Sequence, residues 1–127
     1  TGLKNGNLVI GGENAPDSGI YDEAVYTIMY LAAAGYRSGG HYLILGAPSS
    51  GSLNTTGIVP INSTIAIDIK MDDGLATSGE VVGNSAYTYQ PNCYTNIVQS
   101  GGIMSSGDYN VGNSSGICTI LFKQTDW

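Results

Sequence analysis

The sequence predicts an α+β domain with an antiparallel β-sheet, one packed helix at about residues 20–34 and a disulfide-closed C-terminal loop. Three observations predict this class. Apolar residues recur at helical spacing in one segment, short apolar runs bounded by turn residues recur elsewhere, and both cysteines lie in the C-terminal third. The length of 127 residues predicts a single domain spanning residues 1–127.

The composition excludes several classes of partner. Ten acidic and four basic residues leave a net charge of −6, and such a surface repels phosphate. Nucleic acid and anionic lipid are therefore not expected to bind. Nineteen glycines, together with many Ser, Thr and Asn residues, predict a fold rich in turns, because glycine readily adopts positive φ angles.

The helix at residues 20–34 is predicted from its period and its end signals. Asp17 or Ser18 is placed to cap it, Glu23 lies in the first turn where the helix dipole favours negative charge, and Gly35 is placed to end it. Its apolar stripe recurs at helical spacing: Ala24, Ile28, Leu31 and Ala32.

Short strands are expected before and after this helix, at residues 8–10, 41–45, 58–61, 80–83, 86–89 and 117–122. The segment 62–74 supports two interpretations. Its isoleucines alternate with polar residues as in a strand, whereas Asn62 or Ser63 at its start and Gly74 at its end are typical of helix ends.

The two cysteines, Cys93 and Cys118, are expected to form one disulfide, the alternative being two buried free thiols. Both lie in a Gly/Ser-rich stretch where a short chain has little else to stabilise it. Closing this loop would stabilise the fold by roughly 3 kcal/mol on chain-entropy grounds. A disulfide predicts an oxidising compartment, such as the periplasm, the cell surface or the medium.

Three segments carry a resemblance to a known family. The first is Glu23 followed by an amphipathic segment that ends in Tyr30-Leu31-Ala32-Ala33-Ala34-Gly35-Tyr36. The second and most specific runs from Ala66 to Val81 and contains Ile67-Asp68-Ile69-Lys70-Met71-Asp72-Asp73-Gly74. The third is the late cysteine pair. Together they resemble the globular heads of bacterial type IV pilins and type II secretion pseudopilins, over roughly residues 20–127.

The resemblance implies a pilin-like head and a structural role. It favours a short helix for residues 62–74. It implies a subunit of a type IV pilus or related filament, with other pilin subunits as partners and its head on the filament surface outside the cell, in adhesion or motility. The family's N-terminal hydrophobic helix, absent here, would anchor the subunit in the bacterial inner membrane before assembly. No enzymatic activity and no cofactor are implied.

The acidic residues Asp68, Asp72 and Asp73 form the candidate metal site. Calcium takes several oxygen ligands, and some pseudopilins bind it, although the spacing is not that of an EF-hand. The structural alternative is a capped turn, in which Asp72 and Asp73 accept hydrogen bonds from nearby backbone N–H groups and Gly74 takes a positive φ.

Single residues bear on other possible functions. His41 is the one histidine, and no Gly-x-Ser-x-Gly motif accompanies it, so no catalytic residue is expected. Nine tyrosines leave a secreted carbohydrate-binding or adhesin module as the alternative to a filament subunit, because aromatic faces bind sugars in lectins. A pseudopilin of a type II secretion system is the other alternative.

Overall fold

The computed structural model describes residues 10–13, 15–34, 37–48, 54, 56–83, 93–100, 103–113 and 115–124. Within these residues the fold contains one α-helix, three antiparallel sheets and one disulfide. The predicted α+β class and antiparallel pairing are therefore confirmed. No helix in these residues is long and apolar enough to cross a membrane.

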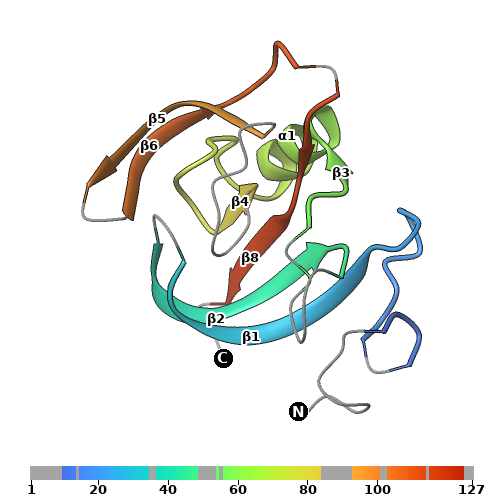
Figure 1. Ribbon diagram of the computed structural model, residues 1–127. Helices are drawn as coiled ribbons and strands as arrows, with labels where there is room; N and C mark the ends of the chain where they lie inside the picture. Colours follow the sequence, from blue (N-terminus) through green and yellow to red (C-terminus); the bar gives the residue numbers. More distant parts are fainter. Residues whose placement is uncertain are drawn as a thin grey trace.

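The largest sheet has four antiparallel strands in the order β1-β2-β8-β4 (Figure 1). β1 (Val25–Ala34) and β2 (Arg37–Gly46) are ten residues each and form a long curved ribbon. β8 (Ile120–Gln124) pairs with β2, and the short β4 (Val81–Gly83) closes the other edge. The strands predicted at 41–45 and 80–83 are confirmed, whereas the single strand predicted at 117–122 is divided at Thr119 between two sheets, with residues 117–118 in one and β8 in the other.

The single described helix, α1 (Ile61–Met71), follows directly on β3 (Val59–Pro60). β3 pairs antiparallel with β7 (Ile117–Cys118), and the Ile61 N–H donates to the Gly116 carbonyl at 3.0 Å. The short edge segment expected at 58–61 is therefore present, with its last residue already helical. Pro60 is tolerated because this two-stranded sheet has only edge strands.

The stretch between the cysteines, predicted as a loop, contains a third sheet. β5 (Tyr94–Ser100) and β6 (Ile103–Tyr109) pair antiparallel, with register shifts between Thr95 and Gln99. Glycine and serine obscured the strand pattern in the sequence, since both are poor strand formers. Cross-strand pairing compensates for this, and it depends on contacts that a single strand does not reveal.

The helix predicted at residues 20–34 is wrong. Ser18 Oγ accepts hydrogen bonds from the N–H groups of Ile20 and Tyr21, at 3.2 and 3.1 Å, as a helix cap would. The turn that it caps stops at Glu23, whose φ of 65° is left-handed. Residues 25–34 then form β1, because their β-branched and aromatic side chains suit a strand that β2 pairs along nearly its whole length.

The short helix favoured for residues 62–74 is confirmed as α1. Ile61, Thr64 and Asp68 are its buried residues and lie on one face at helical spacing. Neither Asn62 nor Ser63 caps it, because Pro60 occupies the N-cap without a side-chain hydrogen bond. Gly74, at φ 75°, ends the segment in the left-handed conformation that glycine adopts readily.

The core has two main parts. One lies between the large sheet and α1 and contains, among others, Leu45, Val59, Val81 and Ile120. The other surrounds the disulfide and contains Ile61, Ala76, Cys93, Tyr94, Tyr109 and Cys118. The S–S distance of 2.07 Å and the Cα–Cα distance of 5.3 Å confirm the predicted disulfide.

A buried polar residue joins β1 to β2. The Asn54 side-chain amide donates to the carbonyls of Val25 and Ile44, at 3.0 and 2.9 Å, and its oxygen accepts from Thr27 Oγ1 at 2.6 Å. Asn54 is fully buried, so these bonds satisfy a group that would otherwise oppose folding. The strands predicted at 86–89 and, apart from Ile10, at 8–10 lie outside the described residues.

Candidate functional site

Asp68 is the buried centre of the acidic cluster. It lies in the last turns of α1 and has no exposed surface. One carboxylate oxygen accepts from the Gly74 N–H at 2.9 Å, and the other accepts from the Tyr109 hydroxyl at 2.6 Å. Asp68 therefore connects the end of α1 to the turn that follows it and to the end of β6.

Asp72 and Asp73 organise the chain between α1 and β4. Asp72 Oδ2 accepts from the N–H groups of Glu80 and Val81, the latter at 2.9 Å. Asp73 accepts from the Leu75 N–H at 2.8 Å and from Ser78 Oγ at 2.6 Å. These contacts hold the start of β4 against the C-terminal end of the helix.

A glycine is required where this turn closes on Asp72. Gly79 has a φ of 72°, and a Cβ on it would overlap the Asp72 carboxylate. A larger residue there would be strained in its backbone and would displace the acceptor of the β4 N–H groups. The Asp-Asp-Gly segment and Gly79 thus form one local structure.

Burial raises the pKa of Asp68 above its ordinary value of 3.8. The hydrogen bonds from Tyr109 and Gly74 oppose this shift because they favour the ionised form. The negative charges of Asp73 and Asp72 add to it. The protonated form of Asp68 is therefore more favoured in the folded chain than in the unfolded one.

The three carboxylates are close enough to share a cation. One oxygen from each of Asp68, Asp72 and Asp73 lies within 4.8 Å of the others. All three side chains already accept hydrogen bonds from their own turn or from β6, as the structural alternative expects. A calcium ion would compete with these donors, so calcium binding here stays a prediction, and the contacts favour the capped turn.

The disulfide lies beside this cluster. Cys93 precedes β5 and Cys118 ends β7, so the bond ties the β5–β6 sheet to the β3–β7 sheet. Both cysteines are fully buried and share a core with Tyr109, the hydroxyl donor to Asp68. The covalent link and the buried carboxylate therefore stabilise the same region.

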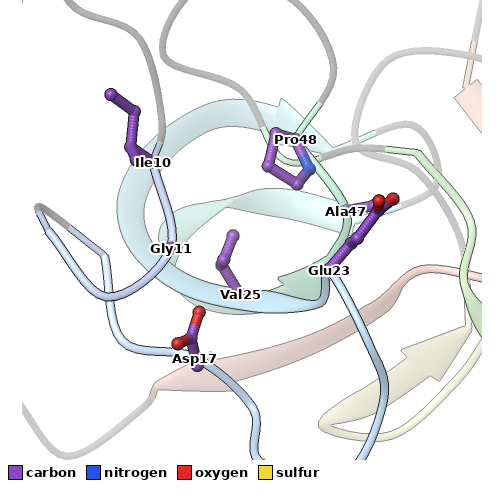
Figure 2. A pocket seen from close by; sticks show the side chains of 7 residues that line it. All are labelled: Ile10, Gly11, Asp17, Glu23, Val25, Ala47 and Pro48. Carbon is purple, nitrogen blue, oxygen red and sulfur yellow. The ribbon is translucent and has the colours of Figure 1, made fainter.

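A second acidic region surrounds a pocket near the start of β1. Figure 2 shows Asp17 and Glu23 on two sides of Val25, in a pocket of about 420 Å³ that Ile10, Gly11, Ala47 and Pro48 complete. None of the seven lining residues is basic. The pocket was not predicted from the sequence, because a helix was expected from residue 20 onward. Residues 14–19 are of the types that form turns, and Gly19 has the positive φ of such a turn, at 70°.

This pocket has acidic side chains at its rim and apolar side chains at its base. Val25 and Ala47 are buried, whereas Asp17 and Glu23 are exposed at the rim. None of the lining residues is a Ser, Cys, Lys or His that could act as a nucleophile or general base beside the carboxylates.

His41 lies on β2, away from both acidic regions. Its ring packs edge to face against Tyr30 of β1, with ring centroids 5.3 Å apart. This contact is a cross-strand pair, since Tyr30 and His41 are register partners. His41 thus has a place in the sheet that needs no catalytic role.

Comparison of the chain with protein-family models, with curated proteins and with solved structures gave no match.

Proposed function

We propose that this chain is the globular head of a filament subunit of the type IV pilin kind, with a structural role. Two of the three segments that resemble this family support the proposal. The segment 66–81 and the cysteine pair meet in one region, where α1, the acidic turn and β4 lie against the disulfide core. The segment 23–36 gives no such support, because it was expected as a helix and is largely a strand.

The observation that carries the proposal is how the acids of segment 66–81 are used. Asp68, Asp72 and Asp73 accept hydrogen bonds from the turn and strand that follow α1. The most specific motif of the chain therefore acts on its own backbone. Such use suits a domain whose task is to keep its shape in an assembly.

The same proposal includes place and partners. A disulfide is typical of proteins outside the reducing cytosol, which suits a head exposed on a cell-surface filament. Copies of the same or related subunits are the proposed partners. A hydrophobic helix preceding the head would anchor it in the inner membrane before assembly and pack inside the filament afterwards.

The decisive test is the N-terminus of the native protein. We expect the protein to be recovered from material sheared off the cell surface, beginning with a processed residue, typically a methylated Phe, that leads into an apolar helix. An abundant cytoplasmic protein, followed in the same fraction, controls for lysis. A native start near Thr1 with no preceding helix overturns the proposal and favours a secreted binding module.

A further inference from the structure

The β5–β6 hairpin is joined to the other described elements mainly at its base. β5 and β6 contact each other along their length, and neither has comparable contact with another described helix or strand. Figure 1 shows the hairpin extending away from α1 and β8. At the base, Tyr94 pairs with Tyr109, and the Asn110 N–H donates to the Cys93 carbonyl at 2.9 Å. The position of the hairpin therefore depends on the groups at this base.

Tyr109 anchors the base of the hairpin to β4 and to α1. Its ring lies so close to Gly83 of β4 that a Cβ on this glycine would be 2.9 Å from it. Its hydroxyl donates to the Asp68 carboxylate of α1 at 2.6 Å in a buried setting. Hydrogen bonds to a carboxylate are among the stronger ones, and low polarity around them strengthens them further. Tyr109 therefore holds the hairpin against two other elements.

The same base covers the disulfide. Cys93 and Cys118 have no exposed surface, and Tyr94 and Tyr109 pack with them in one cluster. The two tyrosine rings stack on each other, with centroids 6.4 Å apart. A reductant must attack one of the two sulfur atoms directly. Because neither cysteine is exposed, part of this cover has to move before the disulfide can react.

We propose that the base of the β5–β6 hairpin opens while the four-stranded sheet stays folded, and that the Tyr109–Asp68 hydrogen bond controls how often this opening exposes the disulfide to reduction. The opening requires Tyr94 and Tyr109 to leave the core. It breaks no backbone pairing among β1, β2, β8 and β4. Openings of single units cost less free energy than unfolding of a whole domain. The hairpin is thus a redox-sensitive element of the fold.

The reductant is a small dithiol, and the exchange is balanced. One thiolate of the dithiol attacks a sulfur of the Cys93–Cys118 bond and forms a mixed disulfide. The second thiol then displaces the protein sulfur, so the dithiol becomes a cyclic disulfide and the protein gains two electrons and two protons. The reduced hairpin has lost its covalent link and should open more often. The inference rests on these contacts and does not need the proposed function.

The test is the rate at which dithiothreitol reduces the full chain under native conditions, followed by trapping of the new thiols with a maleimide and mass spectrometry. We expect this rate to change little in dilute urea, because a local opening exposes little surface. A rate that rises with urea as steeply as the global unfolding constant would show that the whole domain must unfold first, and it would overturn the inference.

Variants separate local opening from global unfolding. Tyr109→Phe should raise the reduction rate about tenfold or more, because it keeps the ring and removes the hydroxyl donor to Asp68. The matched control is Tyr30→Phe, on β1 at a side chain 63% exposed, and it should leave the rate unchanged. Asn54→Ala removes buried hydrogen bonds between β1 and β2, so it weakens the sheet and should also leave the rate unchanged. The inference fails if Tyr109→Phe reacts at the wild-type rate or if Asn54→Ala accelerates reduction equally.

Amide exchange of the reduced chain shows which part opens. Protection of the β5–β6 ladder should fall on reduction, while protection of the β2–β8 ladder should remain. Thermal unfolding checks that each variant is folded, and the urea dependence of the wild-type rate needs no variant. Equal loss of protection in both ladders would mean that the hairpin does not open as a separate unit.

Discussion

Two acidic regions of this molecule place the same chemistry in opposite settings. Around Asp68, Asp72 and Asp73 the carboxylates accept hydrogen bonds from their own turn or from Tyr109, although only Asp68 is buried and Asp73 is exposed. Around Asp17 and Glu23 the carboxylates are exposed at the rim of a pocket. The acids of the first region are used within the fold, whereas Asp17 and Glu23 are exposed.

The number of acids in a segment does not decide their role. What decides it is whether N–H donors converge on the carboxylates. In the first region the chain turns back after α1 and delivers the N–H groups of Gly74, Leu75 and Val81. In the second region Glu23 adopts φ 65° and the chain leaves into β1.

The largest expected effect is loss of the disulfide beside the first region. Replacing both cysteines, as Cys93→Ser/Cys118→Ser, should lower the free energy of unfolding by about 3 kcal/mol, because the unfolded chain regains its entropy. Urea unfolding in non-reducing buffer measures this. Amide exchange at Gly74 should speed up more than at Tyr26, which lies near the pocket. An unchanged unfolding midpoint would contradict a stabilising role for the disulfide.

Removal of single carboxylates should separate the two regions. Asp68→Ala leaves the Gly74 N–H and the Tyr109 hydroxyl without their acceptor and should cost about 2–3 kcal/mol. Asp17→Ala, at the exposed pocket rim, should change stability by less than about 0.5 kcal/mol. Chemical unfolding of both variants makes the comparison. Equal losses would show that the pocket acid is as structural as Asp68.

The raised pKa of Asp68 predicts a dependence on pH that Asp68→Asn should remove. The native pKa of Asp68 lies above the unfolded value of 3.8. Between these two pKa values, Asp68 is mostly protonated in the native state and mostly ionised in the unfolded chain. The contribution of Asp68 is full below pH 3.8 and falls as pH rises through the native pKa. Unfolding free energies of wild type and variant should therefore converge or cross over this interval, and parallel curves would contradict the shift.

The smallest effect is expected at Glu23. A left-handed conformation strains most residues other than glycine, asparagine and aspartate, so Glu23→Gly should stabilise the fold by about 0.5 kcal/mol after the entropy cost of glycine. The control is Asp22→Gly, at a neighbouring residue without a positive φ, which should destabilise. Differential scanning calorimetry can measure both. A loss of stability in Glu23→Gly would mean that its side chain contributes more than the strain costs.

In the C-terminal half, the turn at Gly74 and the disulfide could be predicted from the residues, whereas the choice of a helix over a strand for residues 62–74 rested on the resemblance to pilin heads. The helix 61–71 ends at Asp-Asp-Gly, and Gly74 takes the predicted positive φ. The Cys93–Cys118 bond follows from an even count in a glycine-rich, secreted-looking chain. The β5–β6 sheet was missed because its strands are stabilised by each other rather than by an apolar pattern.

The segment 20–34 shows where local reasoning fails. Its apolar spacing fits a helix, and Ser18 does cap a turn, yet β-branched and aromatic residues from Val25 to Tyr30 favour a strand. Only β2 decides between these interpretations, because it supplies backbone partners along β1. The pocket of Asp17 and Glu23 exists only as a consequence of that choice.

The positive φ of Gly74 and the turn around it could be predicted from residues close in the chain, and the disulfide from a count of two cysteines, which allows one pairing. Only contacts between distant segments made residues 25–34 a strand, brought Asp68 to Tyr109 and placed Asp17 and Glu23 around one pocket. These features arise from contacts between segments far apart in sequence, and no local pattern encodes which partner a segment will meet.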